Sequence, residues 1–97
     1  MLDAEKVRKG EQFIQDNGQA IIDDITTVGA VRSVEGEAAP GAPYGEGPRK
    51  ALDTALAIAK RMGLAIGEDD GHVGWAELPG TEKGHLATIT HLDIVPE

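Results

Sequence analysis

The stretch 48–62, PRKALDTALAIAKRM, constrains the fold more than any other part of the sequence. It is rich in Ala and Leu, and six apolar residues recur every three or four positions along one face: Ala51, Leu52, Ala55, Leu56, Ala59 and Met62. Pro48 suits the first helical position, where its missing N–H is not needed, and Gly63 is a typical C-terminal stop. The pattern predicts a helix over 48–62.

A second apolar stripe runs through the first thirty residues at mostly helical spacing: Val7, Phe13, Ile14, Ile21, Ile22, Ile25 and Val28. Asn17-Gly18 interrupts it. A glycine in a helix interior costs up to about 1 kcal/mol, and an asparagine can cap a new helix. We therefore expect two consecutive helices, over about 3–16 and 18–29.

The rest of the chain predicts loops and short strands. Residues 30–47 form a Gly- and Pro-rich stretch, which favours an irregular loop, and the Gly45-x-Gly47 within it reads as a turn and not as a phosphate-binding motif. Beyond the helix at 48–62 come the apolar run 64–66, a turn at 68–71, a strand over 72–78 and a largely apolar β-type run over 85–91. The expected fold class is α/β, with two or three helices followed by about three short strands.

Composition excludes several classes of protein. The chain has 97 residues, a formal net charge of −8 and no cysteine. The acidic balance argues against binding nucleic acid or an anionic membrane, and the missing cysteines exclude disulfides, thiolate zinc sites and thiol nucleophiles. No apolar run approaches the roughly 20 residues of a membrane helix, and the N-terminus lacks the features of a signal peptide. We expect a cytoplasmic protein.

The residues best suited to chemistry are His91 and Asp93, at the end of the apolar run 85–91. In an extended backbone two residues at this spacing point the same way, so the carboxylate can approach one imidazole nitrogen while the other faces a ligand. Metal-bound histidines commonly have such a carboxylate partner. Taken alone, the pair is compatible with a metal ligand or with a strand-end histidine beside a solvated aspartate.

A complete metal site is not evident in the sequence. His85 lies six residues from His91 on the same expected strand, too far to share an ion with it, and nothing aims His72 at the pair. The acidic cluster Glu68-Asp69-Asp70 lacks the ligand spacing of a calcium loop and is interpreted as a solvated turn. Ser33 has no nucleophile motif around it.

Beyond these local patterns, the segment His91-Leu92-Asp93-Ile94-Val95-Pro96 resembles the His-x-Asp-Val-Val-Pro signature of zinc-aminopeptidase-like enzymes, which include aminoacylases, deacylases and bacterial dipeptidases. The stretch Ile21–Ile25, followed by Val31-Arg32-Ser33-Val34, resembles the opening helix of that family and the Ser-Val after it. Three further stretches resemble the peptidase V (carnosinase-type) branch of dipeptidases: 43–48, 59–64 and 70–75. The resemblance covers nearly all of the chain.

This resemblance implies that residues 1–97 are the N-terminal portion of a metallopeptidase catalytic domain. It implies a hydrolase of dipeptides that uses two zinc ions. In it His91 would bind one zinc ion, and Asp93 would be the catalytic-site carboxylate that holds His91 in place. The other metal ligands and the general base would lie beyond Glu97, so we expect the 97-residue chain alone to be inactive.

Two alternatives remain open at this stage. The parent enzyme could instead remove acyl groups from amino acids, as acetylornithine and succinyl-diaminopimelate deacylases do. The chain could also be a stand-alone, non-catalytic module that forms a homo-oligomer through exposed strand edges.

Overall fold

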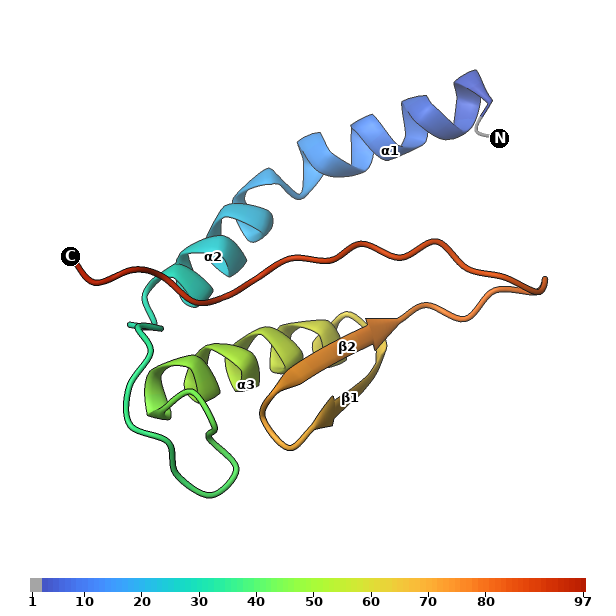
Figure 1. Cartoon of the computed structure of the whole chain (residues 1–97). Coiled ribbons are helices and arrows are strands. Elements are labelled where there is room, and N and C mark those ends of the chain that lie inside the picture. Colours follow the sequence, from blue (N-terminus) through green and yellow to red (C-terminus); the bar gives the residue numbers. More distant parts are fainter. Residues whose placement is uncertain (1–2) are drawn as a thin grey trace.

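The computed structural model describes residues 3–97 and contains helices followed by a small antiparallel sheet (Figure 1). The elements are α1 (Ala4–Asp16), α2 (Gly18–Gly29), α3 (Glu46–Arg61), β1 (Ala65–Asp69) and β2 (Val73–Glu77). The α/β class predicted from the sequence is confirmed.

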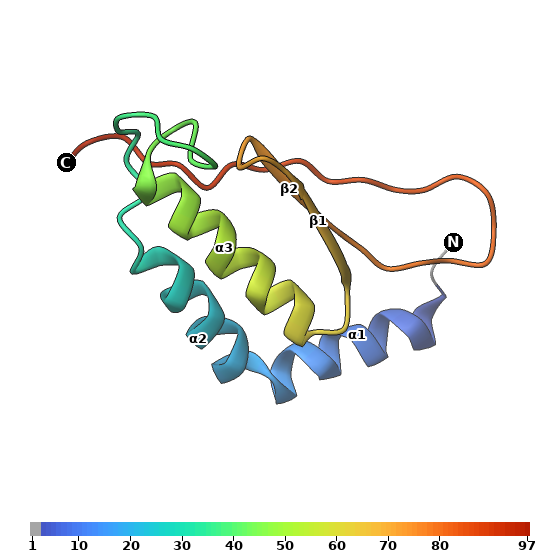
Figure 2. The same cartoon turned by 90° about the horizontal axis from the view of Figure 1, so that it is seen from below.

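The first two helices follow each other with a break at Asn17, as the sequence predicts. Asp3 caps α1 by accepting a hydrogen bond from the backbone N–H of Lys6 at 2.8 Å. The side chain of Asn17 does not cap α2; instead its Nδ2 donates to the carbonyl oxygen of Phe13 at 2.9 Å. Asn17 therefore acts mainly as the end of α1, and α2 leads away from it at an angle that Figure 2 shows clearly.

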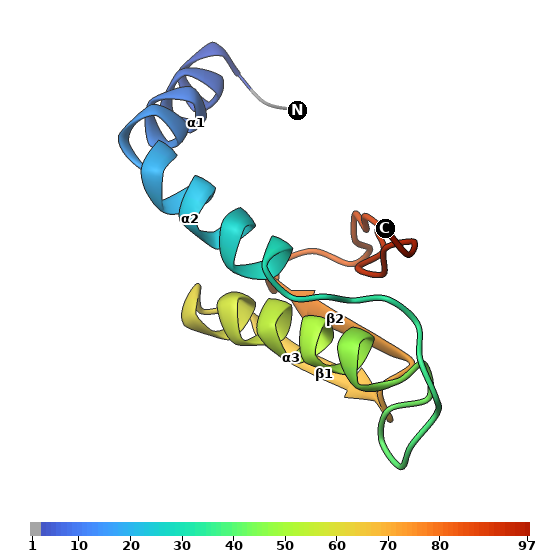
Figure 3. The same ribbon diagram turned by 90° about the vertical axis from the view of Figure 1, so that its left-hand side faces the viewer.

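The third helix begins at Glu46, two residues earlier than predicted. Gly45, with φ 100°, is its N-cap, which leaves Pro48 inside the first turn, where helical N–H groups have no partner. The helix ends as predicted, with Gly63 at φ 88° donating its N–H to the carbonyl oxygen of Lys60. It lies between α2 on one side and the β1–β2 hairpin on the other (Figure 3).

The hairpin pairs Ala65 with Glu77 and Asp69 with Val73. Positive φ angles at Asp70 (48°) and Gly71 (79°) form its turn, so the acidic stretch that predicted a turn belongs partly to β1. The hairpin packs closely on α3 because β2 carries Gly74, where a Cβ atom would lie 2.7 Å from Leu52 Cδ1.

The third expected strand does not form among the described residues. Residues 85–91 are extended, but no strand pairs with them, and Leu86 and Ile89 are 95% and 97% exposed. A strand needs a neighbour to satisfy its backbone N–H and C=O groups, and the described part of the chain places none alongside this segment. Beyond this segment Leu92 contacts Ser33, and Ile94 forms an isolated parallel bridge with Val34.

The Gly- and Pro-rich loop before α3 is held by specific hydrogen bonds. Gly36 donates to the carbonyl oxygen of Tyr44 at 2.8 Å, and the guanidinium of Arg49 reaches the loop at the carbonyl oxygen of Gly41. Arg49 also binds both carboxylate oxygens of Glu68, at 2.8 and 2.7 Å. The hydrogen bonds with Glu68, and then with the neighbouring Asp53, raise the pKa of Arg49. This one side chain connects the loop, α3 and β1.

The described structure is extended for its size. Its accessible surface is 8099 Å², against about 5,300 Å² for a compact protein of this mass. Its radius of gyration is 16.0 Å, against about 12.5 Å for a compact chain of this length. Large apolar side chains are exposed on α1, α2 and the segment after β2: Phe13, Ile14, Ile22, Ile25, Leu86 and Ile89. None of the three helices over residues 3–97 has the length and apolar character to cross a membrane.

Candidate functional site

The segment that carries His91 and Asp93 is fixed to the junction between α2 and the loop. The hydroxyl of Ser33 donates to the carbonyl oxygen of Leu92 at 2.6 Å. The backbone N–H of Ile94 donates to the carbonyl oxygen of Ser33 at 3.3 Å, next to the parallel bridge between Val34 and Ile94. These contacts join parts of the chain about sixty residues apart, and Figure 1 shows the C-terminal segment reaching the end of α2.

Alternation along the extended backbone then sets which side chains face inwards. Leu92 is half-buried and lines an apolar groove of about 600 Å³ between α2 and α3, together with residues such as Ile25 and Ile58. His91 and Asp93 precede and follow Leu92 in the sequence, and their side chains are 81% and 66% exposed. The segment is thus anchored by Leu92 and presents the His-Asp pair to the surface.

The histidine and the aspartate contact each other as their spacing predicts. Nδ1 of His91 lies 3.1 Å from Oδ1 of Asp93 and 3.1 Å from the backbone carbonyl oxygen of Asp93. Both oxygens are acceptors, so this geometry favours the tautomer in which Nδ1 carries the proton and donates it. The lone pair is then on Nε2, the ring nitrogen that is left for a ligand.

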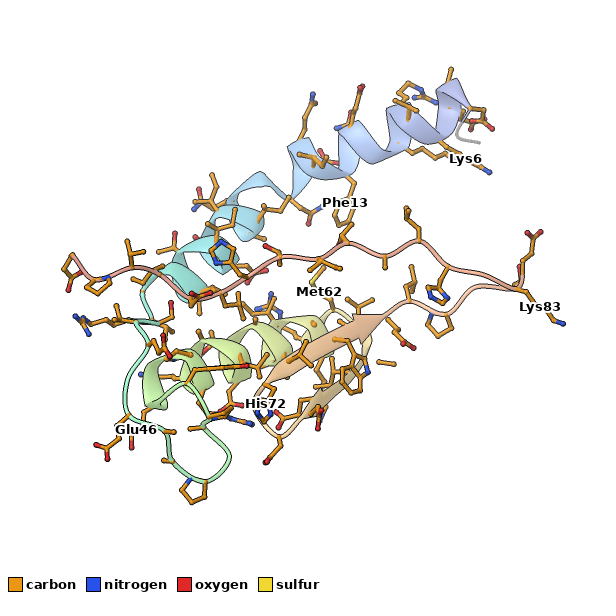
Figure 4. The ribbon with its side chains drawn as sticks, in the orientation of Figure 1. Lys6, Phe13, Glu46, Met62, His72 and Lys83 are labelled. Atoms are coloured by element: carbon orange, nitrogen blue, oxygen red, sulfur yellow. The ribbon has the colours of Figure 1, made fainter. Side chains whose placement is uncertain are left out.

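The other two histidines lie away from the His91–Asp93 pair. The ring of His72, which is labelled in Figure 4, packs edge-on against Tyr44 at the hairpin turn, with ring centroids 5.8 Å apart. His85 lies in the exposed extended segment. Over residues 3–97, no three His, Asp or Glu side chains come together in a group that could hold a metal ion. The described part of the chain supplies one potential ligand with its carboxylate partner.

The sequence does not predict the contacts of two side chains, Glu68 and Ser33. Glu68 belongs to the acidic stretch that predicts a solvated turn, yet it forms the ion pair with Arg49. Ser33 stands out in the sequence only as a nucleophile without a motif, yet its hydroxyl anchors Leu92. Its place in the Val31-Arg32-Ser33-Val34 stretch is the one signal in the sequence that could draw attention to it.

Comparison with known proteins finds relatives that are similar in sequence to most of this chain. No family model matches the chain. It is 36% identical over 88 residues to a protein of Staphylococcus aureus strain USA300 named "Putative dipeptidase", and the same identity holds for the counterparts in strains NCTC 8325 and MRSA252. Each match spans 89% of this chain and 19% of the relative. The chain therefore spans about a fifth of the length of the curated relatives it matches, and over most of its own length it is similar to part of these proteins.

Proposed function

We propose that this chain is part of the catalytic domain of a zinc-dependent dipeptidase, in which Nε2 of His91 binds one of two zinc ions. The observation that carries the proposal is the 3.1 Å contact between His91 Nδ1 and Asp93 Oδ1, on a histidine whose side chain is largely exposed. A carboxylate in this position fixes the tautomer of a metal-binding histidine and increases its basicity. The names of the relatives support a dipeptide substrate over an N-acyl amino acid.

The donor atoms suit zinc, which commonly takes neutral imidazole nitrogens as ligands. When bound, zinc polarises a peptide carbonyl and lowers the pKa of a bound water. The role of this chain is to hold the lone pair of Nε2 in a fixed direction, through Asp93 on the ring and Leu92 in the groove. The remaining ligands would come from the rest of the proposed enzyme, so the 97-residue chain alone is expected not to hydrolyse dipeptides.

The test uses the natural product, purified with an antibody against this sequence. We expect a protein about five times the length of this chain, in line with its relatives. It should hydrolyse a dipeptide such as β-alanyl-histidine, lose that activity to a chelator and regain it with zinc. A product of 10.2 kDa alone, or turnover by the 97-residue chain itself, would overturn the proposal.

The surplus surface favours a second candidate, a non-catalytic module that pairs with another copy of itself. The chain exposes about 2,800 Å² more than a compact protein of its mass. A stable interface needs only about 800 Å² from each partner. The unpaired extended segment 85–91 offers a strand edge for such pairing, with Leu86 and Ile89 on its two faces.

The mass measured by sedimentation tests this second candidate directly. If the chain forms a dimer through 85–91, its mass should be about twice 10.2 kDa, and the net charge of −8 should make the dimer weaker at low salt. Leu86→Asp with Ile89→Asp should return the monomer mass. Thr81→Asp, in the turn before the segment, serves as the control that adds charge outside it. A monomer mass for the unaltered chain at all salt concentrations would exclude this module.

A further inference from the structure

We propose that Ser33 is a positioning residue that fixes the orientation of the His91–Asp93 pair. The link from this orientation to metal binding rests on the proposed function. The positioning itself is a property of this chain and can be tested without metal or substrate.

Ser33 is buried in the described structure. The residue is 3% exposed, and it is the one buried polar residue among residues 3–97. A buried hydroxyl without a hydrogen bond destabilises the folded state, so Ser33 strongly favours keeping its hydrogen-bond partner. That partner is the carbonyl oxygen of Leu92, at 2.6 Å.

Ser33 holds the backbone on both sides of Asp93. Its hydroxyl binds Leu92, the residue before, and its carbonyl oxygen accepts the N–H of Ile94, the residue after. The peptide groups that flank Asp93 are thereby fixed, and with them the direction in which its carboxylate leaves the backbone. Because both acceptors of His91 Nδ1 belong to Asp93, the imidazole follows this direction.

The backbone that carries Ser33 is closely packed against α3. The start of α3 lies directly against the backbone around Ser33: a Cβ atom on Gly47 would overlap the carbonyl oxygen of Arg32 and lie 3.2 Å from that of Val34. Because Ser33 also binds Leu92, the packing of α3 against residues 32–34 helps to fix where the extended segment lies. A residue with a longer side chain at position 33 could not make the same short contact with Leu92.

The test is the tautomer of His91 in the metal-free 97-residue chain, read from long-range ¹H–¹⁵N correlation spectra. His85 is the internal reference, because it lies exposed on the same extended segment. In the unaltered chain His91 should carry its proton on Nδ1 more often than His85 does. Ser33→Ala should reduce the ratio of Nδ1–H to Nε2–H at His91 by about five-fold, towards that of His85.

The matched control is Thr26→Ala, which removes a hydroxyl that binds the carbonyl oxygen of Ile22 at 2.8 Å on the exposed side of α2. It should leave the tautomer of His91 unchanged. A role of Ser33 in stability alone would lower the melting temperature of Ser33→Ala and leave the tautomer as it was, and that result would overturn the proposal.

If Ser33→Ala does not fold, Ser33→Cys replaces it, because a thiol keeps a donor at this position but is a weaker donor on a longer bond. Its tautomer ratio should lie between those of the unaltered chain and His85, and an unchanged ratio would overturn the proposal. In the longer enzyme, Ser33→Ala should also lower zinc affinity. A shifted tautomer with unchanged zinc affinity would keep Ser33 as the positioning residue and remove His91 from the metal site.

Discussion

Replacing Asp93 with asparagine in the longer enzyme should lower zinc affinity and dipeptide hydrolysis by about 10–100-fold, the usual effect of removing the carboxylate partner of a metal-binding histidine. The amide of Asp93→Asn could still accept a hydrogen bond, but it has no negative charge to favour a protonated Nδ1 and a basic Nε2. His91→Ala removes the proposed ligand itself and should have an effect at least as large. Zinc affinity measured by competition with a chelator, together with hydrolysis rates, checks both.

Asp16→Asn is the matched control, because it makes the same change at the end of α1, where the carboxylate binds only Gln12 among the described residues. It should change neither quantity. If Asp93→Asn behaves like Asp16→Asn, the carboxylate of Asp93 has no part in metal binding.

Replacing Gly47 with alanine should destabilise the fold by about 1–3 kcal/mol, although alanine is the better helix former. Gly47 lies in the first turn of α3, against the backbone at 32–34 that carries Ser33. A methyl group there would overlap the carbonyl oxygen of Arg32, so the helix or the segment has to shift. Denaturant unfolding should give a lower midpoint, and the tautomer of His91 should move in the same direction as in Ser33→Ala.

Gly10→Ala is the control for this change. Gly10 is also helical, in α1, and nothing lies within 4 Å of the position of its missing Cβ atom. This substitution should stabilise the chain by up to about 1 kcal/mol. Opposite signs for the two glycines would support the close approach of α3 to residues 32–34, and an equal gain at both positions would refute it.

The parts of the fold that sequence reasoning predicts well depend on local interactions. The break at Asn17 and the stop at Gly63 are set within one helical turn, and both predicted boundaries are confirmed. The contact between His91 and Asp93 is predictable for the same reason, because two residues at this spacing in extended backbone lie on the same side.

The parts that sequence reasoning misses depend on partners far along the chain. The apolar run 85–91 has the composition of a strand, but a strand forms only where another strand lies beside it, and none of the described residues does so. Ser33 binds a carbonyl group 59 residues away, and Arg49 binds Glu68 at a separation of 19. No periodicity or local motif encodes such pairs.

The most direct test of the proposed metal site is the anomalous scattering of zinc in crystals of the longer enzyme. We expect a zinc peak about 2.0–2.1 Å from Nε2 of His91, with Asp93 Oδ1 still in hydrogen-bond contact with Nδ1. Zinc bound to other side chains, with Nε2 of His91 free, would contradict the proposed role of this chain.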